Sequence, residues 1–329
     1  MIGRRQLIGL LGGAAVACPV AARAQQTAMR VIAFVNAGSA DGSGSRATAF
    51  RNGLAESGYV EGQNVAVEYH WLEGRNDRLQ GLMADLVRRQ VAVIATPGSV
   101  VAALAAKAAT ATIPIVFAAP EDPVRLGLVD NLARPSGNAT GINSFSQEVT
   151  GKRLRLLHDL VPKAVRFTVL VDPANGSSAQ TTLRGVQEAA PVMGLQLQIV
   201  NAKTIGEIDA AFATFSHERP DALFVAPDAF FNSRGVQFAV LSARERIPAA
   251  FSSRGVVAAG GLMSYGADLI DMARQVGVYT GRILQGAKPA DLPVLQSTKF
   301  IFAINLQMAR TLNIDVPPGV LSIADEVIE

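Results

Sequence analysis

Short apolar runs alternate along most of this chain with longer stretches in which apolar residues recur every three or four positions. The first pattern is typical of buried strands and the second of amphipathic helices, so the sequence predicts strands that alternate with helices. In the first half, the predicted strands are residues 31–35, 64–71, 91–95 and 113–118, and the predicted helices are 48–57, 78–89 and 100–109. Most of these strands are continuously apolar, whereas the helices are amphipathic. This combination favours a parallel sheet that is covered by helices on both faces.

The same pattern restarts after a seam at residues 136–146 that is rich in Gly, Ser and Asn. The second series has predicted helices at 151–160, 181–193, 205–215 and 236–246, and predicted strands at 166–171, 195–200, 222–226 and 247–252. Two βα series of similar size predict two similar lobes, with a first crossing at 141–145. One long sheet is the alternative, but it fits the seam less well.

The first residues have the layout of a secretory signal peptide: Arg4 and Arg5, an apolar run at 7–20 and small residues at 22–24. The apolar run is shorter than the roughly 20 residues that a membrane-spanning helix needs. We therefore expect residues 1–24 to be removed and the chain to be exported to the periplasm. The arginine pair also fits a twin-arginine signal, so Sec and twin-arginine export both stay open.

Cys18 is the only cysteine, and it lies within the apolar run. In a lipoprotein signal it would become the lipidated N-terminus, but Ala15 stands three positions before it, where leucine is usual. A cut after Ala24 fits better and leaves a chain without disulfides. Removing residues 1–24 also takes away three arginines and no acid, which leaves 27 basic and 27 acidic residues. This balance argues against a nucleic-acid partner.

Side chains suited to catalysis are scarce in this sequence. The histidines, His70, His158 and His217, are far apart along the chain, and no His pair has metal-ligand spacing. The sequence contains neither a G-x-S-x-G nucleophile elbow nor a G-x-x-x-x-G-K-[ST] phosphate loop. We therefore predict no catalytic residue, no metal and no cofactor, and we expect a binding protein rather than an enzyme.

Residues 42–47, GSGSRA, fit the G-x-G-x-x-A pattern of a dinucleotide-binding loop. The glycines start six residues after Asn36, too late for the usual tight turn after the first strand. A milder interpretation is that Ser39, Ser43 and Ser45 hold a carboxylate at a helix start, through hydroxyls and backbone N–H groups. Plain N-capping by surface serines is the alternative for each of them.

Polar residues recur where the predicted strands end, and ligands of open α/β sheets bind beyond the carboxyl ends of the strands. These positions are 96–99, 120–123, 172–175, 227–228 and 252–253. Three further places add to these positions: the seam, Ser39 between the first strand and its helix, and Tyr265 directly after the segment 260–264. The candidate ligand-binding residues are therefore Ser39, Thr96, Ser99, Asp122, Phe145, Asn175, Asp228 and Tyr265. Each also has a structural explanation, because Asp-Pro and Asn-Gly pairs form turns and Asp228 can cap a helix.

Several motifs spread over nearly the whole chain are similar to those of one protein family. They are RRQLIGLLGGAA at 4–15, AARAQQ at 21–26, FRNGLAESGY at 50–59, IPIVF at 113–117, DPV at 122–124, GLV at 127–129, LARPSGNATG at 132–141, GGLMSYG at 260–266, GAKPADLP at 286–293 and ADEVIE at 324–329. With these motifs the sequence resembles the ABC-transporter substrate-binding proteins of the tryptophan/tyrosine-binding type.

This resemblance implies the type I periplasmic binding fold: an α/β protein of two Rossmann-like parallel-sheet lobes, joined by a three-crossing hinge around a ligand cleft. It further implies that the chain returns to the first lobe after Tyr265 and crosses once more near Asn305. We expect a first lobe of 28–143 plus about 266–296, and a second of 144–265 plus about 297–329. The implied partners are a small-molecule ligand and a membrane permease with its ATPase, and we expect a monomer.

The function that fits best is that of the periplasmic solute-binding component of an ABC importer. Members of the family with known ligands bind aromatic amino acids. If the ligand is an amino acid, we expect Asp122 or Asp228 to meet its amine, and hydroxyls and helix N-termini to meet its carboxylate. The alternatives are a periplasmic sensor module that signals to a receptor and a nucleotide-dependent enzyme on an α/β fold.

Overall fold

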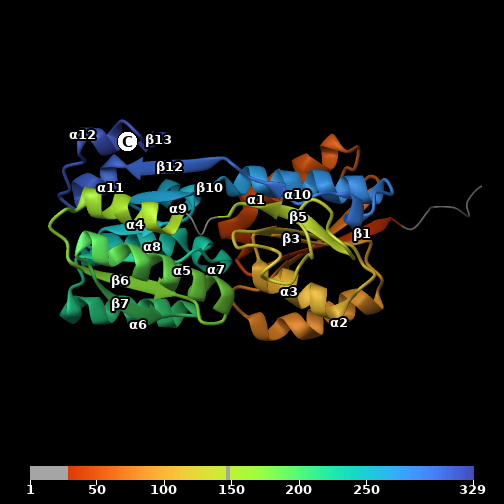
Figure 1. Cartoon of the computed structure of the whole chain (residues 1–329), viewed down its shortest axis with the longest axis horizontal. Helices are drawn as coiled ribbons and strands as arrows, with labels where there is room; N and C mark the ends of the chain where they lie inside the picture. Colours follow the sequence, from red (N-terminus) through yellow and green to blue (C-terminus); the bar gives the residue numbers. More distant parts are fainter. Residues whose placement is uncertain (1–28, 146–148) are drawn as a thin grey trace, which may run out of the picture.

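The computed structural model describes residues 29–145 and 149–329. The chain forms two α/β lobes that lie side by side along the long axis of the molecule (Figure 1). The predicted signal peptide and Cys18 lie outside the described residues. Within the described ranges, no helix has both the length and the apolar character needed to cross a bilayer.

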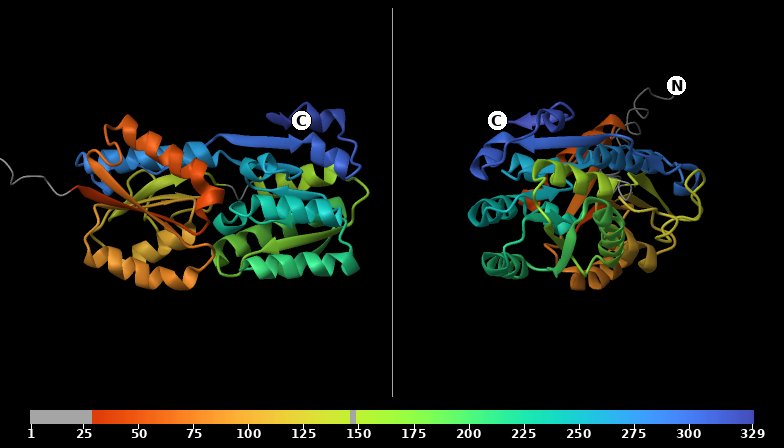
Figure 2. Two further views of the ribbon diagram at one scale, coloured as in Figure 1. Left: turned by 180° about the vertical axis from the view of Figure 1, so that it is seen from behind. Right: turned by 60° about the vertical axis from the view of Figure 1, so that its left-hand side comes forward.

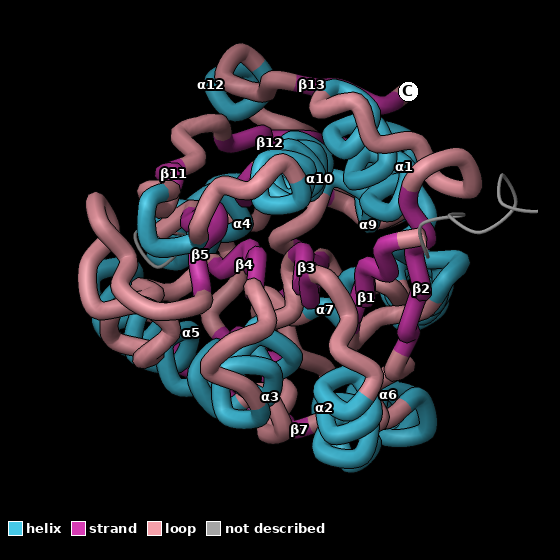
Figure 3. Tube along the Cα trace, turned by 90° about the vertical axis from the view of Figure 1, so that its right-hand side faces the viewer, coloured by secondary structure: helices cyan, strands magenta, loops and turns pink. Residues whose placement is uncertain are grey.

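The first lobe is built on a six-stranded sheet with the strand order β11-β5-β4-β3-β1-β2, in which every pairing is parallel. Its strands are β1 (Arg30–Asn36), β2 (Val65–Trp71), β3 (Val93–Pro97), β4 (Ile115–Ala119), β5 (Ala139–Asn143) and β11 (Leu295–Gln296). Figure 3 shows α1 (Ala40–Glu56) and α10 (Leu269–Leu284) on one face of this sheet. Helices α2 (Leu79–Arg88) and α3 (Val100–Ala109) cover the other face.

The second lobe is built on a seven-stranded sheet with the order β13-β12-β10-β9-β8-β6-β7. Its strands are β6 (Arg166–Val171), β7 (Gln196–Asn201), β8 (Ala222–Val225), β9 (Ala249–Phe251), β10 (Met263–Ala267), β12 (Phe300–Asn305) and β13 (Glu326–Ile328). Its helices are α4 (Val149–Leu160), α5 (Gly176–Ala189), α6 (Ile205–Glu218), α7 (Ala229–Asn232), α8 (Gly235–Glu245), α9 (Arg254–Ala258), α11 (Leu306–Thr311) and α12 (Pro318–Leu321). The predicted two-lobed α/β fold is confirmed, although β12 runs antiparallel to β10.

The chain passes between the two sheets at three places: after β5, after β10 and between β11 and β12. Figure 2 shows the last stretch of the chain returning to the second lobe, where the C-terminus lies. The sequence analysis placed the last crossing near Asn305, which is wrong. Strand β12 pairs with β10 from Phe300 to Ile304, so the chain has already reached the second sheet at Phe300.

Helix α1 begins earlier than the apolar spacing predicted, at Ala40 instead of residue 48. Its N-cap is Ser39, whose hydroxyl accepts a hydrogen bond from the backbone N–H of Gly42 at 3.3 Å, and Asp41 lies in the first turn. Residues 42–47, which fit the dinucleotide pattern, therefore form helical turns and not a phosphate-binding loop.

Helices α1 and α10 pack closely because glycines face each other across their contact. A Cβ atom added to Gly53 would lie 1.9 Å from the carbonyl oxygen of Arg274, and one added to Gly277 would lie 2.1 Å from that of Phe50. No side chain fits at these distances. The contact fixes the start of α10, which lies at the boundary between the lobes.

We predict that Gly277→Ala lowers the free energy of unfolding by about 3 kcal/mol, because the new methyl group must push two helix backbones apart. The matched control is Gly81→Ala in α2, where an added Cβ meets nothing within 4 Å. That control should be neutral or stabilising by up to about 1 kcal/mol, since alanine is the better helix former. Urea unfolding followed by circular dichroism measures both, and equal stabilities of the two variants would contradict the packing account.

Candidate functional site

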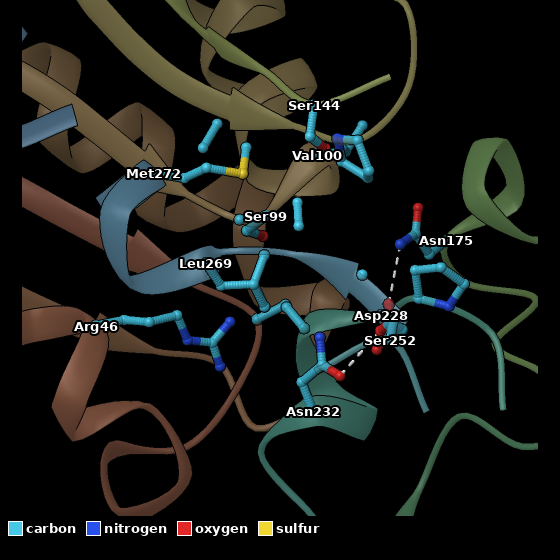
Figure 4. Close-up of a pocket in the computed structure, with 18 of the residues that line it drawn as sticks. Arg46, Ser99, Val100, Ser144, Asn175, Asp228, Asn232, Ser252, Leu269 and Met272 are labelled. Atoms are coloured by element: carbon cyan, nitrogen blue, oxygen red, sulfur yellow. Dashed lines mark hydrogen bonds between the residues drawn. The ribbon is translucent and has the colours of Figure 1, made fainter. Parts of the chain in front are cut away.

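A cavity that is partly open to solvent lies between the lobes, at the carboxyl ends of the strands (Figure 4). Much of the wall is apolar. The polar and charged lining residues are Arg46, Ser99, Ser144, Arg153, Asn175, Asp228, Asn232 and Ser252, and the apolar ones include Val100, Val101, Ala118, Val149, Leu269 and Met272.

Two buried asparagines hold the strand ends of the first lobe in place around the cavity. Asn36, at the end of β1, donates to the carbonyl of Pro97 at 2.8 Å and accepts from the backbone N–H of Gly38. Asn143, at the end of β5, donates to the carbonyl of Ala119 at 3.1 Å. These bonds join neighbouring strand ends and thereby fix the relative positions of the strand ends on the first-lobe side of the cavity.

Arg46 of α1 brings a buried positive charge to the cavity from the first lobe. Its side chain is about 5 % exposed, and its Nη2 donates to the hydroxyl of Ser43 at 2.7 Å. Its Nη1 has no hydrogen-bond partner. Burial lowers the pKa of Arg46 to about 10, an effect that the charge of Asp228 opposes. Arg46 therefore stays charged at neutral pH and has a donor to spare.

Asp228 faces Arg46 from the second lobe, and its carboxylate is already well bonded. Oδ1 accepts from the backbone N–H groups of Phe230 and Phe231, which caps α7, and Oδ2 accepts from Nδ2 of Asn175 at 2.9 Å. Burial raises the pKa of Asp228, and these hydrogen bonds oppose that rise. A carboxylate has about four acceptor positions, so Asp228 retains capacity for one more donor.

Uncharged polar groups complete the lining. Asn232 and Ser252 are joined by a hydrogen bond of 3.3 Å from the Ser252 hydroxyl to Oδ1 of Asn232, as Figure 4 shows. The hydroxyl of Ser99, at the N-terminus of α3, is about 1 % exposed and has no hydrogen-bond partner. A ligand carboxylate placed there would meet a free hydroxyl and the positive end of a helix.

Arg153 of α4 is a second buried arginine on this cavity, and it belongs to the second lobe. Its side chain is 1 % exposed, and its guanidinium carbon lies 4.4 Å from the ring centroid of Phe224. Its Nη1 lies 3.5 Å from the carbonyl of Tyr265, while its Nε and Nη2 have no hydrogen-bond partner. Burial alone lowers its pKa, to about 9, so no acid among the described residues stabilises its charge.

Two further carboxyl groups are buried near the lobe boundary. Burial raises the pKa of Glu121 to about 7; the hydroxyl of Ser178 opposes this rise and the charge of Asp228 adds to it. Burial also raises the pKa of Asp172 to about 7, again with a contribution from Asp228. Three carboxyl groups thus share a poorly hydrated region, which disfavours their simultaneous ionisation.

The lobes touch each other beside the cavity. A Cβ atom added to Gly42 of α1 would lie 2.2 Å from the carbonyl oxygen of Ser233, and one added to Gly38 would lie 2.9 Å from that of Ala229. Only glycine permits these approaches between the first-lobe and second-lobe backbones. The structure therefore shows the lobes closed. A neighbouring cavity shares Arg46, Asn232, Ala267 and Leu269 with the first.

The structure brings three of the candidate residues to the cavity: Ser99, Asn175 and Asp228. Ser39 lines the neighbouring cavity. Thr96 is buried within β3, and its hydroxyl has no partner.

The other candidates lie outside both cavities. Asp122 accepts from the backbone N–H of Val124 at 2.9 Å, as a turn former does. Phe145 is half-buried beside Ser144, with a φ of 44°. The hydroxyl of Tyr265 accepts from Nζ of Lys152 at 2.9 Å, and its ring packs with Phe300 in the second-lobe core.

Arg46, Arg153 and Asn232 line the cavity but were not selected from the sequence. Arg46 lies within the glycine pattern that was considered as a loop. Had the Ser39 cap been used to start the helix, Arg46 would have fallen seven residues later, on the same face as Ser39 and Ser43. No comparable signal marks Arg153, because only the meeting of the lobes makes its position special.

A charged pair across an apolar cavity can hold a small molecule that has an ionised group and an apolar body. In the described ranges, no three His, Cys, Asp or Glu side chains are grouped as a metal site requires. Residues 29–328 match the family model described as ABC transporter substrate binding protein.

The chain belongs to this family of ABC transporter substrate-binding proteins. One family relative is the tyrosine-binding protein of Clostridioides difficile (strain R20291), which is 25 % identical over 267 residues, covering 80 % of this chain and 75 % of the relative.

Solved structures agree with this assignment. An ABC domain from Streptococcus pneumonia in complex with L-Trp is 25 % identical, with a TM-score of 0.80 over 91 % of this chain and 100 % of that one. A conserved domain protein from Vibrio cholerae has a TM-score of 0.81 at 24 % identity, over 91 % and 99 % of the two chains.

The raised pKa of Glu121 predicts a pH-dependent stability. Between about pH 4.5 and pH 7 the folded chain keeps a proton on Glu121 that the unfolded chain has lost, so stability falls as pH rises through this window. Glu121→Gln removes the titrating group and with it this loss of stability. The melting temperature of the variant relative to the wild type should therefore rise with pH and level off above pH 7. The corresponding gain in the free energy of unfolding is on the order of 3 kcal/mol.

The exposed residue Glu188 supplies the control for this measurement. The difference in melting temperature between Glu188→Gln and the wild type should not change with pH. If the difference in melting temperature between Glu121→Gln and the wild type did not change with pH, the carboxyl group of Glu121 would have the same pKa in the folded and unfolded states, which would contradict the prediction.

Proposed function

We propose that this family member binds one small organic carboxylate with an apolar body in the cavity between its lobes, and that it does so without chemical change. The observation that carries the proposal is the pair Arg46 and Asp228, which face each other from different lobes across an otherwise largely apolar wall. Aromatic amino acids are the first candidates, because the Clostridioides difficile relative is a tyrosine-binding protein and the Streptococcus structure contains L-Trp.

An amino acid would use both charges of the pair. Its carboxylate would accept from the free Nη1 of Arg46 and from the hydroxyl of Ser99, which has no partner in the structure. Its ammonium group would donate to Asp228, which has acceptor capacity left. The side chain would lie against the apolar wall that includes Val100, Leu269 and Met272, which would remove that surface from water.

Ligand binding and lobe closure are linked in this proposal. With the lobes apart, each lobe offers half of the contacts; the closed form alone offers all of them, so the ligand shifts the equilibrium towards it. We propose that the three crossings are the hinge, and that the closed form docks on a membrane permease that is driven by an ATPase. A monomer exported to the periplasm would serve this role.

A thermal-shift screen of the refolded protein tests the binding proposal. Because a ligand of the folded state raises the melting temperature, an aromatic amino acid or a related carboxylate should produce a shift, and sugars and nucleosides should not. Isothermal titration should then show that Arg46→Gln weakens binding at least about tenfold. A shift with sugars alone, or unchanged affinity in Arg46→Gln, would refute the proposed ligand class.

The contact of Gly42 with Ser233 predicts a variant that cannot close. Gly42→Leu places a side chain where the second-lobe backbone must come, so the lobes stay apart while each keeps its own core. Small-angle scattering should show a larger radius of gyration than for the wild type in the presence of ligand, and affinity should fall. Gly44→Leu is the control, because an added Cβ there meets nothing within 4 Å. Closure in both variants would contradict the closed contact.

A further inference from the structure

The guanidinium of Arg153 is the least compensated charge among the described residues of the cavity wall. It is 1 % exposed, and two of its three nitrogens have no hydrogen-bond partner. Its remaining contacts are the ring of Phe224 at 4.4 Å and the carbonyl of Tyr265 at 3.5 Å, both uncharged. A buried cation without an anionic partner is strongly destabilising, so a complementary group is expected to reach it.

The charges on the cavity wall do not balance. In the described part of the chain, the ionisable side chains that line it are Arg46, Arg153 and Asp228. Asp228 acts on Arg46, whereas no acid among the described residues acts on Arg153. On the wall that these residues form, one positive charge is therefore left over, because burial favours the neutral forms of the nearby Glu121 and Asp172 below about pH 7. A proton on Asp228 would increase the excess. A zwitterionic amino acid, whose net charge is zero, would leave this excess unchanged.

We infer that the molecule bound in this cavity carries a net negative charge: a carboxylate with an aromatic or other apolar body and no ammonium group. This inference rests on the proposed function and narrows its ligand class. One arginine from each lobe then contributes to holding the anion, so both lobes gain contacts on closure. The apolar wall fits an apolar ligand body, and the uncompensated charge of Arg153 disfavours an ammonium group on the ligand.

Matched pairs of probes that differ only in the ammonium group test the inference. Isothermal titration of the refolded protein compares L-tryptophan with 3-indolepropionate, L-tyrosine with 3-(4-hydroxyphenyl)propionate, and L-phenylalanine with 3-phenylpropionate. We expect each desamino acid to bind at least about tenfold more tightly than the corresponding amino acid. We also expect Arg153→Met to reduce that ratio to near one and Arg153→Lys to retain part of it.

Arg234 supplies the matched control. It is an arginine of the same lobe, its guanidinium carbon lies 5.3 Å from the ring centroid of Phe230, and it lines the neighbouring cavity instead. Arg234→Met should leave the preference for the desamino acids unchanged. A similar loss in both variants would mean that overall charge, and not the position of Arg153, sets the preference, which would overturn the inference.

The ligand-free protein gives a second readout that separates binding from folding. Methionine in place of an uncompensated buried arginine should leave the melting temperature of the ligand-free protein unchanged or raise it. A marked fall would show that Arg153 supports the fold, and the inference would be wrong.

Two outcomes separate this inference from the proposed function. If the amino acids bind more tightly than their desamino partners in the wild type, the inference fails and the proposed function stands. If no member of either series binds, both fail.

Discussion

The electrostatic attraction between the buried guanidinium of Arg46 and Asp228, which face each other across the lobe boundary, is the interaction on which the rest of the structure depends. The two charges belong to different lobes, so water surrounds them when the lobes are apart and is removed when they close. Removing water from a charge is costly, and the pair alone recovers that cost incompletely. A charged ligand between them adds the missing partners. Closure therefore becomes favourable when the site is filled, which is what a binding protein needs.

The remainder of the fold serves this interaction. Helix α1 carries Arg46, and its packing on α10 through Gly53 and Gly277 fixes its position relative to the first sheet. Asp228 caps the short helix α7, so the backbone of the second lobe determines where its carboxylate points. Gly42 lets the two lobes approach until they touch. Arg153 is buried against Phe224 and Tyr265 of its own lobe, and no described residue neutralises its charge.

The sequence predicted the fold well because apolar spacing depends on local burial. The strand at 166–171 and the helix at 100–109 agree with β6 and α3 at both ends. Strand ends also pointed to Ser99, Asn175 and Asp228, which the structure places together. Asp122 follows the same rule, yet it forms a turn. Tyr265, which was chosen because it follows the segment 260–264, lies inside β10 and packs in the core of the second lobe. Arg46 and Arg153 were missed because arginine on a helix ordinarily faces water, whereas tertiary packing buries both of these side chains.

Native mass spectrometry tests the central claim most directly. Refolded wild-type protein and Gly42→Leu are each incubated with one mixture of small carboxylates and amino acids, and the molecules that stay bound are counted. The account predicts one small molecule per wild-type chain and none on the variant, because retention requires the lobes to close. Equal retention by both proteins, or a changed mass of the released molecule, would contradict it.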